Sequence, residues 1–530
     1  MLKPLLDQLK TLFRWPESEP LDYPFVPSDV AELHRVASAP GAAALDEQTW
    51  DDLLLPRYLD RLSAGVSIFG RQVLYQRLRN GMDDQACSAM GERVEMLRRD
   101  PDALATLGGA MRPLRDVDAE VAALLYESER PELPSWARYT WLLPICLALS
   151  LAALLLSQLA WLGVGVALYL LMLVQVRYYD RLGTWQRSVH ALQLLLRVCS
   201  RLKPAPHPLQ QQIAAASRQA SALNHSLSNS SKTSAIPGLG EYADWFMLAN
   251  VKHYFKTVDI VFAQREFLRE CYQHCANLEA DAALARHLLA TPIWCRVQRG
   301  SENALALEGG VHPLIDHPAP LAIGLQGKGA FISGQNAVGK STFLRMLGLN
   351  LVTARAFGFC YARHAVLPAL PVYASMQGED AMLDGESLYV AELRRARELL
   401  AVADGPHRGV YIIDEIFRGT NHLESVSAAA AVLDALAAKG LVIVSSHNLV
   451  LAPLLAHRLD AVVIERDAQG TLALAPGVLA QTNGLTLLGA QGFDPGVQDS
   501  ADKVSRWLGA YLAHPAEGVD VLAGSAEVGR

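Results

Sequence analysis

The stretch "FISGQNAVGKSTFLRM", Phe331 to Met346, decides the fold of the C-terminal half of the chain. It fits the spacing G-x-x-x-x-G-K-S/T of a phosphate-binding loop. The apolar residues before the loop predict a strand that ends near Ser333, and those after it predict a helix that starts near Lys340. This strand–loop–helix context distinguishes a working phosphate loop from a chance match. A plain glycine turn at the start of a helix is the competing interpretation.

The loop predicts a nucleotide site with a bound magnesium ion. Backbone N–H groups and the helix N-terminus would cradle the phosphates. Lys340 would neutralise the β- and γ-phosphate oxygens, and Ser341 is placed to coordinate Mg²⁺. The residues expected to contact the nucleotide are Gly334, Gln335, Asn336, Ala337, Val338, Gly339, Lys340, Ser341 and Thr342.

Two further apolar runs end in polar side chains. "GVYIIDEIFRGT", residues 409–420, predicts a strand that delivers Asp414 and Glu415 to the sheet edge where ligands bind in α/β folds. Asp414 would hold Mg²⁺, and Glu415 would orient the attacking water. "LVIVSSHN" places His447 at the end of a third strand, where it could sense the γ-phosphate. A solvated carboxylate pair and a structural histidine are the alternatives.

Residues 139–176 contain no charged side chain. As one helix these 38 residues would span about 57 Å, nearly twice the ~30 Å hydrocarbon core of a bilayer. Two arms of about 16 to 18 residues, with a turn at Ser157-Gln158, fit better. The flanking residues suit an interfacial belt and a hairpin with both ends in the cytosol: Tyr139, Trp141, Tyr178 and Tyr179, with Arg130, Arg138, Arg177 and Arg181. A buried helical pair in a soluble protein is the alternative.

The remaining chain divides by its periodicity. Helical spacing of apolar residues dominates on both sides of the charge-free run, and from about 301 short β-rich runs alternate with helical segments. Met1–Trp15 predicts an amphipathic helix that packs on the protein or lies on a membrane surface. The expected organisation is an N-terminal arm at 1–44, a helical core and lever at 45–138 and 177–300, the membrane hairpin at 139–176, an ATPase domain at 301–515 and a tail at 516–530.

Composition narrows the function classes. The 530 residues are 51% apolar and 19% charged, with a net charge of −7, which argues against a broadly basic nucleic-acid binder. Seven scattered cysteines indicate reduced cytosolic thiols. Cys271, His274 and Cys275 lie close together in sequence, but no second ligand cluster accompanies them. Helix packing explains them better than a metal site.

These motifs together resemble the MutS mismatch-repair ATPases. "GQNAVGKSTFLR" is similar to the family loop G-P-N-x-x-G-K-S-T-x-x-R, with Gln335 in place of proline, and "DEIFRGT" resembles D-E-x-x-R-G-T. "DAMLDGESLYVAEL" resembles a family segment in which Gly385, Ser387, Tyr389 and Glu392 match. "VHP", "SSHN" and "TNGLTLLGAQG" resemble further ATPase segments. "LDEQTWDDLLL" and "GVSIFGRQVLYQRLRNGMDD" resemble the core and lever more weakly.

The resemblance implies an α/β P-loop ATPase domain of the ABC/MutS type and an all-α lever and core domain, here carrying a transmembrane helical hairpin. It implies ATP and Mg²⁺ as ligands and a homodimer in which Ser387 reaches the γ-phosphate bound to the opposite subunit. The chain departs from the family in several ways. It has no F-x-E wedge, fewer than 50 residues before the lever, and Glu424-Ser425 where Asp-Gly is usual.

Three function classes follow from these observations. The first is a membrane-anchored MutS-family ATPase that drives lever movement as a DNA-binding, mismatch-repair-related protein without the mismatch-reading domain. The second is the same engine acting on a protein or membrane partner, with no DNA contact. The third, an ABC-type transporter ATPase, is weakened because two spans are too few. The expected location is the inner or plasma membrane, multi-pass, with the ATPase domain in the cytoplasm.

Overall fold

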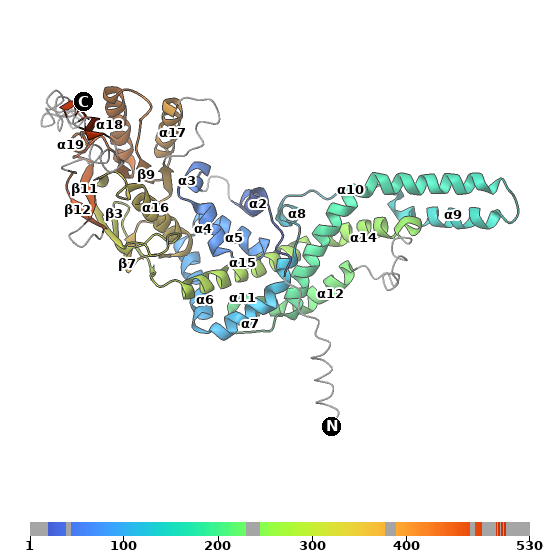
Figure 1. Cartoon of the computed structure of the whole chain (residues 1–530). Helices are drawn as coiled ribbons and strands as arrows, with labels where there is room; N and C mark the ends of the chain where they lie inside the picture. Colours follow the sequence, from blue (N-terminus) through green and yellow to red (C-terminus); the bar gives the residue numbers. More distant parts are fainter. Residues whose placement is uncertain are drawn as a thin grey trace. The chain divides into compact units, whose positions relative to one another are not determined.

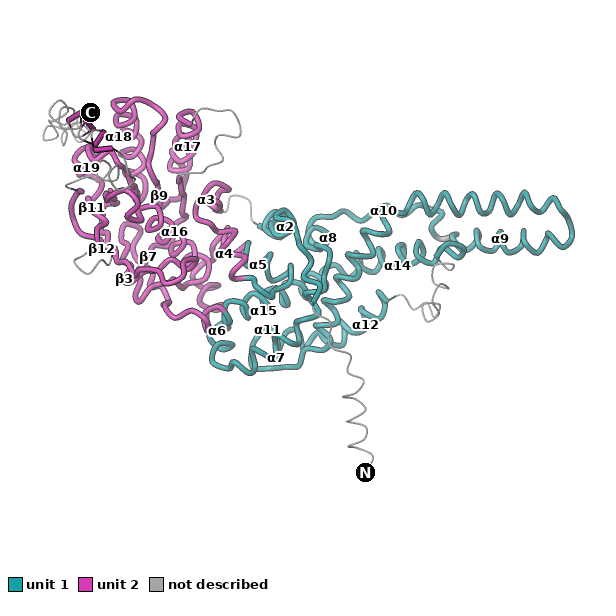
Figure 2. The backbone as a smooth tube through the Cα atoms, viewed as in Figure 1, with its two compact units in different colours: residues 1–38, 63–75, 93–286 teal, residues 39–62, 76–92, 287–530 magenta. Residues whose placement is uncertain are grey.

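The computed structural model describes residues 20–38, 44–228, 244–376, 388–466 and 472–479, with scattered positions between 494 and 504. Met1–Trp15, Ser387 and the "TNGLTLLGAQG" segment therefore lie outside the described residues. The chain forms two compact units (Figure 2), each assembled from separate segments. Unit 1 contains 1–38, 63–75 and 93–286, and unit 2 contains 39–62, 76–92 and 287–530. Residues 45–62 and 76–92, which the sequence assigns to the helical core and lever, thus belong to the same compact unit as the ATPase-like segment.

Unit 2 is built on a six-stranded sheet in the order β12-β11-β5-β10-β9-β8 (Figure 1). All neighbouring pairs are parallel except β11 with β12. The three central strands β5, β10 and β9 are buried at every position, as expected for apolar runs covered on both faces. The strands are β5 (Gly329–Gly334), β8 (Val372–Ser375), β9 (Val410–Asp414), β10 (Leu441–Ser445), β11 (Leu459–Arg466) and β12 (Leu472–Pro476).

Helices cover the two faces of this sheet in turn. Because successive strand residues point to opposite faces, Ile412 contacts Gly348 of α16 (Lys340–Phe357), whereas Tyr411 and Ile413 join the core beneath α17 and α18. Helix α17 spans Leu388–Ala403, α18 spans His422–Lys439, and α19 spans Leu451–Leu454. The parallel sheet with crossover helices that the sequence predicts is confirmed.

Smaller elements complete unit 2. A four-stranded sheet runs in the order β2-β7-β3-β4, and a two-stranded ribbon pairs β1 with β6. Their bounds are β1 (Cys295–Arg296), β2 (Gln298–Arg299), β3 (Ala304–Gly310), β4 (Leu321–Gln326), β6 (Phe359–Cys360) and β7 (His364–Leu367). Two short helices, α3 (Glu47–Asp52) and α4 (Leu55–Leu62), also belong to this unit. They bring an early part of the chain to the sheet.

Among its described residues, unit 1 contains helices and no strand. Its core uses α10 (Ala160–Arg201) and most of α15 (Arg265–Ala290). Around them lie α2 (Pro27–Ala37), α7 (Pro101–Met111), α8 (Ala122–Tyr126), α9 (Leu142–Ala153), α11 (Pro208–Ala215), α12 (Ser217–Leu227) and α14 (Ala249–Ala263). Helices α5 (Ile68–Asn80) and α6 (Asp84–Arg99) contribute residues to both units. Cys271 and Cys275 are buried here, and the Sγ atoms of Cys199 and Cys275 are 3.4 Å apart.

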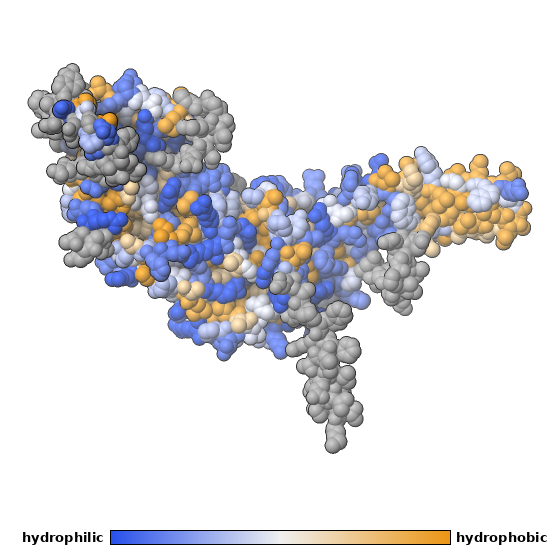
Figure 3. Space-filling view, in the orientation of Figure 1, coloured by the Kyte–Doolittle hydropathy of each residue, from blue (hydrophilic) through white to orange (hydrophobic). Residues whose placement is uncertain are grey.

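The charge-free run folds as an antiparallel pair, α9 and the first part of α10, joined by a turn that includes Ser157-Gln158 (Figure 1). Helix α10 does not stop where the apolar run stops, because no Pro or Gly pair interrupts it, and it continues to Arg201. Among the described residues, α10 alone has the length and composition of a membrane span, while α9 is shorter, with twelve residues. The predicted pair of arms of about 16 to 18 residues each is therefore not confirmed. The apolar side chains of this pair form an exposed surface (Figure 3).

The predicted aromatic belt needs one correction. Tyr139, Trp141 and Tyr179 are exposed, as expected of belt residues. Tyr178 is instead buried, because its ring packs edge-on against Phe255 of α14, with the ring centroids 5.5 Å apart. The sequence prediction that placed Tyr178 in the belt is therefore wrong.

Candidate functional site

The predicted phosphate loop connects β5 to α16. It turns through two positions with positive φ, Ala337 at 60° and Gly339 at 110°, and the second caps the helix. A glycine suits the second position, because such angles are disfavoured for residues with a Cβ atom. Gln335, Asn336, Ala337 and Thr342 are exposed, whereas Val338, Gly339 and Ser341 are half-buried. The structure therefore places the predicted contact residues in one accessible turn at the start of a helix.

Lys340 folds back over this loop. Its Nζ donates hydrogen bonds to the carbonyl oxygens of Gly334, at 3.0 Å, and Gln335, at 3.3 Å. The side chain is buried, and burial lowers its pKa, while the nearby carboxylates of Glu415 and Asp414 act in the opposite direction. The ammonium group is thus held at the loop by two backbone acceptors and lies within the field of both predicted carboxylates.

Asp414 is the last residue of β9, and the parallel register sets it beside Ser445 of β10. The Ser445 hydroxyl donates a hydrogen bond to the Asp414 carboxylate, and both residues are buried. The carboxyl ends of β5, β9 and β10 meet at one edge of the sheet, which is the ligand-binding edge of such folds. Ser341 and Asp414 offer hydroxyl and carboxylate oxygens, the donor type that Mg²⁺ prefers.

Glu415 follows in a left-handed backbone conformation, with φ of 57°. Its N–H donates to the Ser445 carbonyl oxygen at 3.0 Å, which fixes the strand end. One carboxylate oxygen lies 2.7 Å from His447 Nε2, and the other lies 3.3 Å from Arg418 Nε. The Glu415 side chain is only 13% exposed. The structure therefore brings Glu415 and His447 together and adds Arg418 as a further neighbour of the carboxylate.

Glu392 of α17 supports the loop that carries Arg418. Its Oε2 accepts hydrogen bonds from the backbone N–H groups of Arg418, at 2.9 Å, and Gly419, at 3.3 Å. A Cβ atom at Gly419 would lie 2.6 Å from the backbone nitrogen of Tyr389, so only glycine fits there. These contacts explain in physical terms why Glu392, Tyr389, Arg418 and Gly419 occur together. The sequence matched all four to a family pattern without giving any of them a role in this loop.

Helix α3 closes the outer edge of the sheet beside this site. Thr49 Oγ1 accepts from the N–H of Ala374, and Asp52 Oδ2 accepts from the N–H of Met376, each at 2.8 Å. These side chains satisfy donors of the edge strand β8 that would otherwise lack a ladder partner. Arg345 Nε of the phosphate-loop helix donates to the Asp52 carbonyl oxygen at 3.0 Å. Burial raises the pKa of the Asp52 carboxyl to about 6.

Arg395 of α17 binds the same helix from the other side. Its guanidinium lies 3.2 Å from both carboxylate oxygens of Asp46 and 3.3 Å from Thr49 Oγ1, and it also donates to the Ala374 carbonyl oxygen. The side chain is almost fully buried. Asp46 in turn caps α3 by accepting from Thr49 N–H at 2.6 Å. Three parts of unit 2, namely α3, β8 and α17, are therefore held by one buried guanidinium.

A cavity of about 530 Å³ lies between α3, the N-terminal half of α17 and the Glu415 loop. Its lining is rich in charged side chains, and both Asp414, the predicted metal ligand, and Glu415, the predicted catalytic carboxylate, contribute to it. The charged residues that line it are Asp51, Asp52, Glu392, Arg394, Arg395, Glu398, Asp414, Glu415 and Arg418. Of the predicted site residues, Ser387 lies in the chain just before α17, outside the described residues.

Comparison with known proteins places this site in a family. Residues 330–482 match the family MutS domain V. The chain is 32% identical over 175 residues to the "DNA mismatch repair protein MSH3" of Coccidioides immitis, covering 31% of this chain and 15% of that protein. It is 30% identical over 181 residues to the "DNA mismatch repair protein MutS" of Thermus thermophilus, covering 33% and 21%. The match thus spans about a fifth or less of the length of these relatives.

Proposed function

We propose that the chain is a Mg²⁺-dependent ATP hydrolase of the MutS family, because residues 330–482 match MutS domain V. The observation that carries the proposal is the meeting of Lys340, Asp414 and Glu415 at one sheet edge, with His447 on Glu415. ATP fits because a phosphate loop, a strand-end carboxylate pair and a strand-end histidine serve γ-phosphate chemistry. The ABC-type transporter alternative is not retained, because the matched family is MutS domain V.

Each residue has a defined task in this proposal. Backbone N–H groups of the loop and the Lys340 ammonium bind the phosphate oxygens and stabilise their negative charge. Ser341 and Asp414 would hold Mg²⁺, which neutralises further phosphate charge. Glu415 orients the attacking water and accepts its proton, since a carboxylate fixed by two neighbours is already directed. The His447 ring contacts the same carboxylate through Nε2 and holds it in position.

Comparing two lysines tests the hydrolase. We expect Lys340→Ala to lower ATP turnover by about a hundredfold or more, because it removes the cation that contacts the phosphates. Lys328→Ala is the matched control, since Lys328 belongs to the same unit, lies between β4 and β5, and has a side chain that is 42% exposed. Turnover should stay near wild type in the control. Equal turnover in all three proteins would refute the proposed site.

We propose a homodimer with two composite sites, based on the family resemblance of the Ser387 segment. Mixing Lys340→Ala subunits with Ser387→Ala subunits should restore part of the activity, because one composite site in each mixed dimer keeps both intact residues. Light scattering gives the oligomeric state in the same samples. A monomer with full turnover would contradict this proposal.

We propose that the α9–α10 pair anchors the protein in a lipid bilayer. Its exposed side chains are almost all apolar, and near the turn Leu155 is 91% exposed, Leu156 89% and Leu159 85%. Water would be an unfavourable solvent for such a surface, and lipid a favourable one. Deleting residues 139–176 should release the protein into the soluble fraction with its ATP turnover intact. A full-length protein that stays soluble without detergent would contradict the anchor.

We propose that the ATPase acts on DNA, because the relatives that the chain matches are named DNA mismatch repair proteins. The exposed apolar pair favours a second candidate, a protein or membrane partner without DNA. Electrostatic DNA binding weakens steeply as salt rises, so affinity measured from about 50 to 200 mM salt separates the two. Salt-dependent binding supports DNA, and no binding at low salt supports the other partner class.

A further inference from the structure

Three consecutive large apolar side chains stand exposed just before α14. Trp245 is 53% exposed, Phe246 41% and Met247 57%, whereas the next residue, Leu248, is fully buried. Contiguous exposed apolar side chains of this size usually mark a contact with a partner or a membrane. The sequence analysis did not single this segment out, because one short apolar run carries no periodicity.

Hydrogen bonds fix the position of this segment along the axis of α10. Gln175 Nε2 donates to the Asp244 carbonyl oxygen at 2.5 Å, and Asn250 Nδ2 donates to Gln175 Oε1 at 3.0 Å. Gln175 is buried in this network. It is the second-last residue of the charge-free run, which ends at Val176. The exposed triad is therefore held at the level where the apolar surface of α10 gives way to charged residues.

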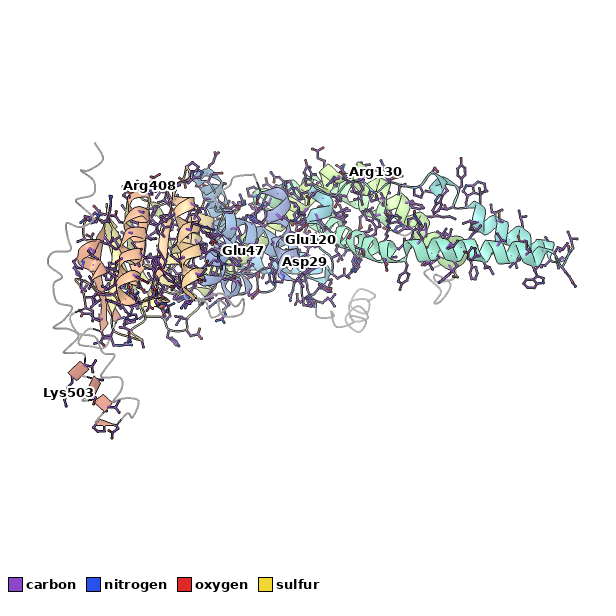
Figure 4. All side chains as sticks on the ribbon, turned by 90° about the horizontal axis from the view of Figure 1, so that it is seen from above. Asp29, Glu47, Glu120, Arg130, Arg408 and Lys503 are labelled. Atoms are coloured by element: carbon purple, nitrogen blue, oxygen red, sulfur yellow. The ribbon has the colours of Figure 1, made fainter. Side chains whose placement is uncertain are left out.

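Apolar packing confirms this register. Leu248 and Val251 belong to the same core cluster as Leu171 and Ala167 of α10. From there α14 runs toward the charged part of the unit, where Trp185 of α10 donates to Thr257 at 2.9 Å. The ion pair of Arg130 with Asp259, at 2.6 Å, lies farther along α14 (Arg130 is labelled in Figure 4). The start of α14 thus lies beside the apolar run of α10, and its later turns lie beside the charged part of α10.

Other amphipathic aromatic residues occur at this level. Tyr139 and Trp141 precede α9, Tyr179 lies one turn beyond Gln175, and all three are exposed. Trp and Tyr concentrate at the boundary between lipid and water, where the ring meets acyl chains and the polar atom meets headgroups. Trp245 has the same chemistry. The segment therefore continues the surface of the proposed anchor.

We propose that Trp245, Phe246 and Met247 form a second lipid-contacting element, lying in the headgroup–acyl boundary of the bilayer that holds the α9–α10 pair. The inference rests on the proposed membrane anchor and names an additional site on it. The occupant is phospholipid, because the triad is continuous with the apolar surface and held at its edge. A short apolar segment at this level would limit how far α10 can slide into the membrane.

Photocrosslinking from exposed methionines tests this inference in the full-length protein. A benzophenone amino acid replaces Met247, Met172 in the apolar run of α10, or Met96, which is 41% exposed on α6 of the same unit. The proteins are reconstituted in vesicles of phosphatidylethanolamine and phosphatidylglycerol, and lipid adducts are measured by mass spectrometry. We expect the yield at Met247 to approach that at Met172 and to exceed that at Met96 by about fivefold or more.

The three positions separate the possible failures. Adducts at Met172 without adducts at Met247 would overturn the inference and leave the anchor intact. Absence of lipid adducts at both Met172 and Met247 would overturn the anchor itself. Adducts of Met247 with protein instead of lipid would overturn the inference by showing that a polypeptide covers the triad.

Discussion

Asp52→Asn is expected to stabilise unit 2 at neutral pH. Burial raises the pKa of Asp52 from 3.8 to about 6, which corresponds to about 3 kcal/mol lost when the carboxyl ionises in the folded state. The Asn amide oxygen can accept the Met376 N–H in place of the carboxylate, so the change removes the charge and keeps the hydrogen bond.

The pH dependence gives the prediction its sign. Because folding raises the pKa of Asp52, the folded state holds the proton more tightly than the unfolded chain does. Stability is therefore greatest below pH 3.8, and it falls as pH rises through about 6. The gain in unfolding free energy from Asp52→Asn should therefore be about 1 kcal/mol at pH 4.5 and up to about 3 kcal/mol at pH 8. Urea unfolding in mild detergent, at both pH values, measures it. Asp51→Asn, at an exposed neighbour on α3, is the control.

Two results would refute this reasoning. The first is an Asp52→Asn protein no more stable than wild type at pH 8. The second is a difference between the two proteins that does not change with pH, since the ionisation of Asp52 would then not be its cause.

Further predictions concern the loop and α3. Gly419→Ala should lower the free energy of unfolding by about 1–3 kcal/mol and also lower ATP turnover, because the added Cβ atom would lie 2.6 Å from the Tyr389 nitrogen. Gly324→Ala is the control, since a Cβ atom there would meet nothing within 4 Å, and it should change neither property. Arg395→Met should destabilise unit 2 by about 2–4 kcal/mol in urea unfolding, because it strips Asp46, Thr49 and the Ala374 carbonyl of one shared donor, and an unchanged stability would contradict its bracing role. His447→Ala should lower turnover more than ATP affinity, because His447 contacts Glu415, and a loss of affinity alone would contradict that assignment.

Local patterns predict the centre of the site well. The phosphate loop, Asp414, Glu415 and His447 each end an apolar strand, and parallel strands bring such ends to one edge without further information. Their meeting therefore follows from the sequence. The sequence also predicts a turn near Ser157-Gln158, and the structure has a turn there, between α9 and α10.

Contacts between distant segments are not predictable in this way. Thr49 and Ala374 are 325 positions apart, and nothing in the spacing of α3 indicates that its side chains will satisfy an edge strand. Tyr178 is of the residue type expected in an aromatic belt, but the aromatic rings of α14 bury it. The motif that contains Arg418 does not indicate that Arg418 contacts the Glu415 carboxylate. In each case tertiary packing decides the role of the side chain.

ATP binding and hydrolysis by Glu415→Ala test the central claim most directly. The full-length variant is mixed with Mg²⁺ and labelled ATP, and bound nucleotide and released phosphate are measured in the same sample. We expect binding close to wild type, because Lys340, Ser341 and Asp414 remain, and hydrolysis slower by about a hundredfold or more, because the group that orients the water is gone. Hydrolysis at the wild-type rate would contradict the account.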